Sequence, residues 1–255
     1  MSIIQANRFG KGQHLIILHG FLGMGDNWKS LGKKWAANGY CVHLLDMRNH
    51  GKSFHDDTFN YEVMTQDVVD YLAYEQIKNV QVIGHSMGGK IAMHLAVNHP
   101  QLVDKLVVVD IGPKSYPSHH DEILEGLTLL EENQLESRKK ADELLSKTIK
   151  EPGIRQFLLK NLYRDKGNLL RLRVNLRVIK ENVDEIGKEL PYELQFTGPA
   201  LFVRGDQSDY ITAADEKRIL HHFPNAGIKS IQNSGHWVHA EQPVVFFDTV
   251  DSYLN

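Results

Sequence analysis

Residues 79–97 constrain the fold of this chain more than any other stretch. Residues 79–83 are mostly β-branched and apolar, as in a buried strand, and residues 90–97 repeat apolar side chains every three to four positions, as in a helix. Between them, residues 84–88 read G-H-S-M-G and fit the pattern G-x-S-x-G. A sharp strand-to-helix turn at this pattern strains the serine backbone and exposes its hydroxyl. The stretch therefore predicts that Ser86 is a nucleophile rather than part of a structural turn.

Strands and helices alternate on both sides of this turn. The expected strands are residues 14–19, 41–46, 79–83, 106–110, 199–204 and 228–232. The expected helices are residues 28–37, 61–74, 90–97, 215–223 and 242–254. Continuous apolar strands that alternate with helices indicate a parallel sheet covered on both faces. We therefore expect an α/β fold with a mostly parallel sheet and helices on both of its faces.

The alternation stops between Pro113 and Tyr192, where the sequence favours helices without an intervening strand. The segments expected to be helical are residues 121–132, 136–150, 154–163 and 168–182. We therefore expect a helical cap at residues 113–192, inserted after the strand that ends at Asp110. Residues 1–112 and 193–255 would form the core domain.

The nucleophile needs a base and an acid. His236 directly follows the last expected strand, and it comes after Ser86 in the chain, as the order serine, acid, histidine requires. We expect His236 to be the base. A carboxylate must then hold the imidazole in the correct tautomer. Position alone leaves two loops open, one with Asp110 and the other with Asp206 and Asp209.

Acyl transfer also needs two N–H donors for the developing oxyanion. One is expected from Met87, directly after the nucleophile. The other is expected from Phe21, because the loop at residues 19–23 reads H-G-F-L-G and follows the first strand.

Other features exclude competing functions. A net charge of −3 argues against a general nucleic-acid binder. Residues 46–53 end in Gly-Lys-Ser, but Asp46 stands where a phosphate-binding loop needs glycine, so a structural loop with an Asp–Arg interaction is expected. The pairs at 119–120 and 221–222 are adjacent histidines without a cluster of further ligands, so we expect them at the surface. We expect no cofactor and no metal.

The chain contains one cysteine, Cys41, which cannot form an internal disulfide and is expected as a buried thiol in a strand. The first residues lack the basic and apolar segments of a signal peptide, and no apolar run approaches the roughly 18 residues of a membrane span. A cytoplasmic protein without membrane insertion is the expectation. Its oligomeric state is left open.

Basic residues gather in the expected cap. They are Arg138, Lys139, Lys140, Arg155, Lys160, Arg164, Lys166, Arg171, Arg173 and Arg177. We expect most of them on solvated helix faces, paired with nearby acids. The alternative is that some hold an anionic part of the substrate, with Arg171 and Arg173 as the residues to test.

These motifs together resemble the α/β-hydrolase superfamily and, within it, the small bacterial acyl-CoA esterases of the YbfF type. The resemblance covers most of residues 14–254, and its most specific segments are residues 46–51, 84–90, 109–113, 155–160 and 235–240. It implies Asp110 as the acid, with Ser208 near the histidine. Asp206 and Asp209 depart from that pattern and keep the later acid position open.

The expected function is that of a cofactor-free serine hydrolase acting on a small-molecule ester. The resemblance adds acyl-CoA thioesters as further substrates. Alternatives on the same fold are a C–C bond hydrolase, a perhydrolase and a lyase of menaquinone synthesis. A non-catalytic ligand-binding module is the alternative from another class, and Ser86 and His236 argue against it.

Overall fold

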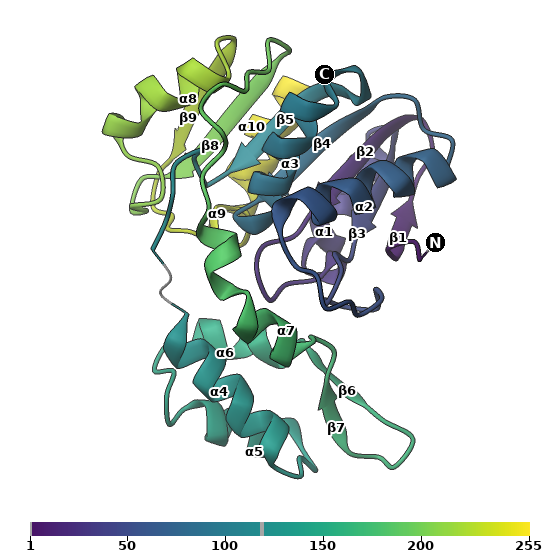
Figure 1. Ribbon diagram of the computed structural model, residues 1–255, viewed down its shortest axis with the longest axis vertical. Helices are drawn as coiled ribbons and strands as arrows, with labels where there is room; N and C mark the ends of the chain where they lie inside the picture. The colour runs from purple at the N-terminus through teal and green to yellow at the C-terminus, as the bar shows by residue number, and fades with distance from the viewer. Residues whose placement is uncertain (1, 118–119) are drawn as a thin grey trace.

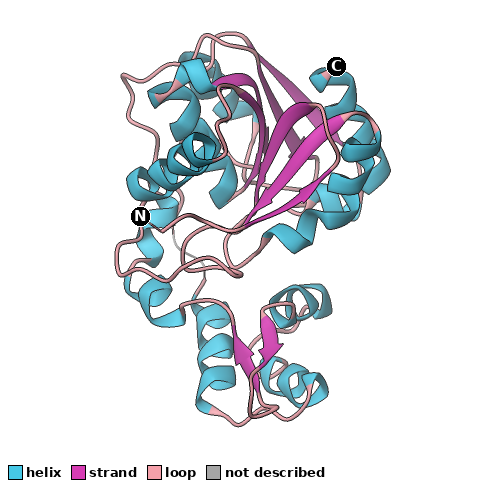
Figure 2. Ribbon diagram, turned by 90° about the vertical axis from the view of Figure 1, so that its right-hand side faces the viewer, coloured by secondary structure: helices cyan, strands magenta, loops and turns pink. Residues whose placement is uncertain are grey.

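The computed structural model describes residues 2–117 and 120–255, and its upper lobe is built on a seven-stranded sheet (Figures 1 and 2). In spatial order the strands are β1 (Ala6–Phe9), β3 (Tyr40–Leu45), β2 (Gln13–Leu18), β4 (Val80–His85), β5 (Val103–Val109), β8 (Ala200–Gly205) and β9 (Ala226–Ile231). β1 pairs antiparallel with β3, and the other neighbours are parallel. The expected α/β fold with a mostly parallel sheet is confirmed.

Helices cover both faces of this sheet. They are α1 (Lys29–Ala37), α2 (Tyr61–Tyr74), α3 (Met87–Asn98), α8 (Glu216–His222), α9 (Val238–Glu241) and α10 (Pro243–Leu254). Successive side chains of a strand point to opposite faces. In β2, Leu15 and Ile17 therefore enter the core shared with α1 and α10, while Ile16 and Leu18 enter the core shared with α2 and α3. Burial on both faces explains why the central strands are apolar throughout.

Between β5 and β8 the chain forms the lower lobe of Figure 1. Its elements are α4 (Asp121–Glu132), α5 (Arg138–Leu145), α6 (Pro152–Leu159), β6 (Leu162–Arg164), β7 (Leu170–Leu172) and α7 (Leu176–Glu181). The helical prediction is wrong at β6 and β7, which pair antiparallel. Asp165 explains the turn, because its carboxylate accepts hydrogen bonds from the Gly167 and Leu169 amides at 2.8 and 3.0 Å.

Lys90 of α3 contacts both segments that join the two lobes. Its Nζ donates hydrogen bonds to the carbonyls of Lys114, at 2.5 Å, and Lys188, at 2.8 Å. The ammonium also faces the Tyr116 ring, 5.1 Å from its centroid. The side chain is fully buried, and burial lowers the pKa of Lys90 to about 7. The two carbonyls and the ring offset part of the cost of burying the ammonium.

Some side chains differ in exposure from the sequence expectation. His222 is buried, and one of its ring nitrogens lies 2.8 Å from the Leu194 carbonyl, so its expected surface position is wrong. Cys41 is half-buried on β3. His119 lies outside the described residues.

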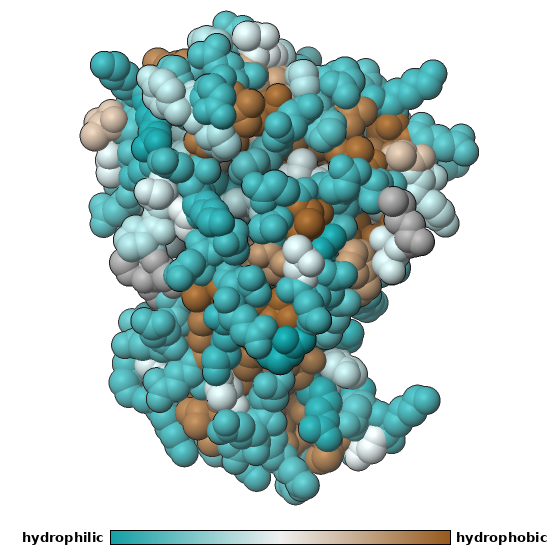
Figure 3. Space-filling view, viewed as in Figure 1, coloured by the Kyte–Doolittle hydropathy of each residue, from teal (hydrophilic) through white to brown (hydrophobic). Residues whose placement is uncertain are grey.

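Polar side chains cover most of the face in Figure 3, with apolar patches that include some where the two lobes meet. In the described chain, no helix combines the length and the apolar character needed to span a bilayer.

Candidate active site

Ser86 lies on the sharp turn between β4 and α3. Its backbone angles are φ 52° and ψ −117°, outside the regions that side-chain-bearing residues usually adopt. The flanking glycines make this turn possible. A Cβ on Gly84 would lie 2.2 Å from the Gly88 carbonyl oxygen, and one on Gly88 would lie 2.3 Å from the Leu18 carbonyl oxygen. The turn thus requires the glycines of the G-x-S-x-G pattern.

The structure brings Ser86, His236 and Asp110 together from three separate loops. His236 lies between β9 and α9, and its Nε2 is 3.0 Å from Ser86 Oγ. Its Nδ1 is 2.8 Å from Asp110 Oδ2, directly after β5. With Nδ1–H donating to the carboxylate, Nε2 presents a lone pair to the serine hydroxyl.

Asp110 is fully buried and hydrogen bonded on both carboxylate oxygens. Ser208 Oγ donates to Oδ2 at 2.5 Å, and the Gly205 amide donates to Oδ1 at 3.1 Å. Hydrogen bonds to the charged form stabilise a buried carboxylate that would otherwise be costly. Asp110 also has a positive φ of 50°, a backbone conformation that is uncommon for residues with a side chain.

The other two candidate acids lie elsewhere. Asp206 is exposed and accepts a hydrogen bond from the Ser234 amide at 3.1 Å. Asp209 is exposed at the rim of a neighbouring cavity. Within the described residues, neither carboxylate contacts His236. Ser208, the neighbour implied by the resemblance, lies against Asp110.

Aromatic rings hold His236 in place. The Tyr210 ring stacks on it with centroids 3.9 Å apart. Below it, His85 Nε2–H donates to the His236 carbonyl at 2.9 Å. Burial, together with the neighbouring His239 and His236, holds the pKa of His85 well below its usual value. A neutral His85 adds no positive charge beside the imidazolium that would form on His236.

The two expected oxyanion donors flank Ser86. Met87 is the first residue of α3, where a helical amide has no acceptor within the helix. Phe21 follows Gly20, and a Cβ on Gly20 would lie 3.4 Å from the Ser86 Cβ. Across the described chain, neither the Phe21 nor the Met87 amide donates to a protein acceptor.

Two buried histidines anchor the loop that carries Phe21. His50 Nε2 accepts from the Leu22 amide at 3.2 Å, and its Nδ1–H donates to the Arg48 carbonyl at 2.9 Å. His19 Nε2 accepts from the Met47 amide at 3.0 Å. Burial lowers the pKa of His50 to about 3 and that of His19 to about 4. Both are therefore neutral near pH 7, as these hydrogen bonds require.

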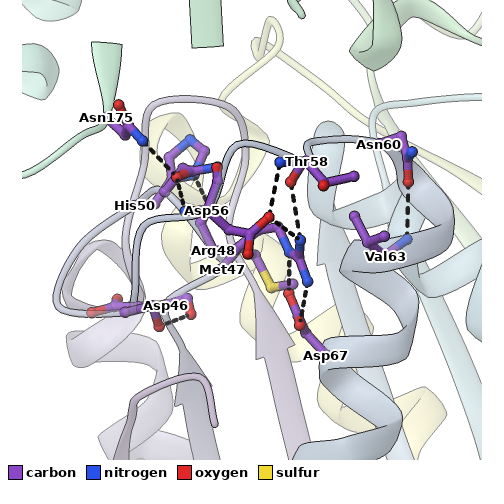
Figure 4. Close-up of polar contacts among 12 residues, drawn as sticks. Asp46, Met47, Arg48, His50, Asp56, Thr58, Asn60, Val63, Asp67 and Asn175 are labelled. Carbon is purple, nitrogen blue, oxygen red and sulfur yellow. Dashed lines mark hydrogen bonds and ion pairs between the residues drawn. The ribbon is translucent and has the colours of Figure 1, made fainter. Parts of the chain in front are cut away.

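The loop at residues 46–53 is itself held by a buried ion pair (Figure 4). Arg48 points toward α2, where its Nε and Nη2 contact the two Asp67 oxygens at 2.6 and 2.7 Å. Asp56 lies 3.4 Å from Arg48 Nη1. The expected Asp–Arg interaction therefore uses Asp67 and Asp56. Asp46 accepts instead from the Gly25 amide at 2.7 Å.

Two cavities meet at Ser86. Their volumes are about 600 and 510 Å³, and both are lined by Phe21, Ser86, His120 and Tyr210. His120, which was expected at the surface, is half-buried and lines both cavities. The apolar residues of the larger cavity include Trp28, Ile123, Ile154, Phe157, Leu158 and Trp237. Sequence reasoning missed these residues because they come from elements far apart in the chain and form no motif.

Few of the basic residues of the lower lobe reach these cavities. Lys160 lines the larger cavity. Arg171 pairs with Asp165 at 3.0 Å on the exposed β6–β7 hairpin. Arg155 and Arg177 likewise pair with acids. Eight of the ten basic residues are exposed, as expected, but only Arg155, Arg171 and Arg177 form ion pairs with acids in the described chain.

Comparisons with known proteins agree with this architecture. The family model described as alpha/beta hydrolase fold matches residues 13–243. The chain is 38% identical over 247 residues to the mouse (Mus musculus) sn-1-specific diacylglycerol lipase ABHD11, covering 94% of this chain and 80% of the relative. It is 35% identical over 244 residues to the Escherichia coli esterase YbfF, covering 94% and 92%.

A solved structure described as a marine microorganism esterase superposes with a TM-score of 0.95 at 35% identity, covering 99% of this chain and all of that one. The resemblance noted from the sequence motifs is thereby confirmed. The chain belongs to the α/β hydrolase fold family, and within that family it is a hydrolase of the esterase/lipase type.

Proposed function

We propose that this hydrolase cleaves carboxylic esters, and acyl thioesters such as acyl-CoA, through an acyl-enzyme at Ser86. The observation that carries the proposal is the 3.0 Å contact between Ser86 Oγ and His236 Nε2, with Asp110 against the other ring nitrogen. A nucleophile and a base within hydrogen-bond reach, with the base oriented by a third group, can activate a serine near neutral pH. Relatives named as an esterase and a diacylglycerol lipase support ester chemistry.

In the acylation step, Ser86 Oγ attacks the substrate carbonyl while His236 Nε2 takes the hydroxyl proton. Asp110 stabilises the imidazolium without taking its proton. The negative charge on the carbonyl oxygen is stabilised by the Phe21 and Met87 amides. When the tetrahedral intermediate collapses, His236 returns the proton to the departing alcohol or thiol.

In the deacylation step, water replaces the leaving group. His236 removes a proton from the water as it attacks the acyl carbonyl. When the intermediate collapses, His236 returns that proton to Ser86 Oγ, and the carboxylic acid is released. All the groups needed belong to the chain. Because a thiolate leaves more readily than an alkoxide, the same groups serve a thioester.

The two cavities fit the two halves of an ester. In this proposal the larger, apolar cavity takes the acyl chain, since burying methylene groups against Phe157, Leu158 and Trp237 is favourable. The smaller cavity, which Lys114 and Asp209 also line, takes the leaving group. Residues 113–192 would act as the cap, and residues 1–112 with 193–255 as the catalytic core.

Labelling with a fluorophosphonate probe tests the nucleophile. The wild-type protein should be labelled rapidly, Ser86→Ala should not be labelled, and His236→Ala should be labelled far more slowly. A matched Ser208→Ala control should still be labelled at Ser86. An unlabelled wild-type protein would exclude an activated serine.

An acyl-chain series then tests the substrate class. We expect turnover of both p-nitrophenyl esters and acyl-CoAs, with KM falling as the chain lengthens until the larger cavity is filled. Turnover of the esters without any turnover of acyl-CoA would remove the thioester half of the proposal.

A further inference from the structure

A second group of reactive side chains lies at the opposite edge of the sheet from Ser86. It consists of His14 on β2 and Cys41 and His43 on β3, near the amino ends of these strands. The carboxyl ends of the same strands lead to Gly20 and Asp46, on the side of the active site. The proposed hydrolysis uses none of the three residues.

The sheet itself aligns the three side chains. His14 is the register partner of Cys41, and His43 lies two residues further along β3. All three side chains therefore point to the same face of the sheet. Their sulfur and nitrogen atoms lie within 4.8 Å of one another.

The spacing of these atoms is close to that of a metal site. His14 Nδ1 is 3.0 Å from His43 Nε2, and Cys41 Sγ is 3.4 Å from the same nitrogen. A tetrahedral zinc ion separates two nitrogen ligands by about 3.4 Å, and a nitrogen from a sulfur by about 3.6 Å. These two distances lie within a few tenths of an ångström of those values, and all three ligand atoms lie within 4.8 Å of one another.

A neighbouring residue orients the central ligand. His43 is fully buried, and its Nδ1 lies 2.7 Å from Tyr71 Oη on α2. When Nδ1–H donates to that oxygen, Nε2 presents its lone pair toward His14 and Cys41. Metal-binding histidines characteristically use their second nitrogen in this way.

Solvent access is also compatible with a cation. His14 and Cys41 are half-buried, so solvent reaches the group and can supply a fourth ligand. Arg8 on β1, the register partner of His43, brings a positive charge near the group, and that charge forms an ion pair with Glu75 at 2.5 Å.

We propose that His14, Cys41 and His43 bind a divalent cation of borderline softness such as Zn²⁺. Imidazole and thiolate are the ligands that such ions prefer. On binding, the Cys41 thiol releases its proton to solvent as the sulfur–metal bond forms. The ion would join β2 to β3 and stabilise the folded chain, because the unfolded chain does not hold the three ligands together.

Titration of the apo-protein with Co²⁺ tests the proposal. A thiolate ligand gives a near-ultraviolet charge-transfer band, and Cys41 is the one cysteine of the chain, so the band identifies its ligand. We expect this band in the wild-type protein, its loss on adding Zn²⁺, and a rise in Tm of about 5–10 °C at a Zn²⁺ concentration 100 times Kd.

Three variants distinguish a metal site formed by all three residues from metal binding by the Cys41 thiol alone. Cys41→Ser should abolish the band, His14→Ala should weaken Co²⁺ binding at least tenfold, and the exposed-histidine control His55→Ala should bind as the wild type does. Circular dichroism shows whether each variant is folded. A folded wild-type protein without the band would overturn the proposal. So would a band that His14→Ala leaves at full affinity, since it would show an adventitious thiol complex.

Discussion

The proposed catalytic edge of the sheet and the proposed cap, residues 113–192, are built in different ways. At the edge, Asp110 is fully buried with three hydrogen-bonding partners, and His19 and His50 hold the oxyanion loop through buried contacts. The cap pairs many of its charges at the surface, and it contributes apolar side chains such as Phe157 to the larger cavity. In the proposed function, the edge therefore fixes the reacting atoms, while the cap would shape the space that selects the substrate.

The largest effect on activity should come from replacing the Asp110 carboxylate. Asp110→Asn should lower kcat by roughly 10⁴-fold, because the amide favours the wrong imidazole tautomer. Steady-state hydrolysis of a short p-nitrophenyl ester measures this. Asp206→Asn and Asp209→Asn are the matched controls and should stay near wild type. A nearly wild-type Asp110→Asn enzyme would refute the assignment of the acid.

A smaller loss should follow from loosening the oxyanion loop. His50→Ala removes the acceptor for the Leu22 amide, next to Phe21, and should lower kcat by about 10²-fold while KM changes little. His50→Gln keeps an acceptor and should restore part of the rate. If both variants lost the same activity and the same stability, His50 would have a purely structural role.

Changing the cap should alter selectivity instead of chemistry. Phe157→Ala should raise KM for long-chain esters by about tenfold, because the lost ring contributes apolar contact area. The kcat for a two-carbon acyl ester should not change. An equal loss of activity on short-chain and long-chain esters would contradict the separate roles proposed for the two regions.

Acid should weaken the core more than the cap. The described histidines with lowered pKa values lie in the core, and burial lowers those of His19 and His94 to about 4 and that of His239 to about 3. At these histidines the unfolded chain binds more protons than the folded chain below about pH 6.5, so their contribution to the free energy of unfolding falls from there toward pH 4. Urea unfolding at several pH values measures this loss. His94→Gln should reduce its slope, and an unchanged slope would argue against titration of His94.

The smallest effect is expected at the cap surface. Arg171→Ala removes an exposed partner of Asp165 and should leave the ratio of acyl-CoA to neutral-ester turnover unchanged. Lys160→Ala removes a cation from the larger cavity and should lower that ratio a few-fold. If Arg171→Ala lowered that ratio more than Lys160→Ala did, the anionic part of the substrate would bind along the β6–β7 hairpin.

The sequence predicted the sheet apart from β1, the sharp turn at Ser86 and the proximity of Ser86 to His236, because each depends on a few adjacent residues. The catalytic roles of these residues stay a prediction. The acid was ambiguous because Asp110 and Asp206 both follow parallel strands and reach the same edge. The fold distinguishes their positions through a positive φ at Asp110 and the donors Gly205 and Ser208, which no local pattern encodes.

The cap was harder to predict for a different reason. Its β6–β7 hairpin is rich in Leu, Arg and Lys, residues that also favour helices, and Asp165 and Gly167 were the turn signals within it. β1 was missed because its four residues are mostly half-buried and stand alone at the sheet edge. At β6–β7 a local hairpin outweighs the helical preference of its residues, and at β1 the long-range pairing with β3 forms the strand.

The contacts of Lys90 have a consequence for how the two lobes can move. If the two segments that join the lobes were independent of the sheet domain, the lower lobe could move without disturbing the candidate active site. Here both linkers accept a hydrogen bond from one buried amine, and that amine belongs to the helix that begins directly after Ser86. Movement of either linker away from α3 would break a hydrogen bond to this buried amine, so the position of the lower lobe is coupled to the helix that positions Ser86.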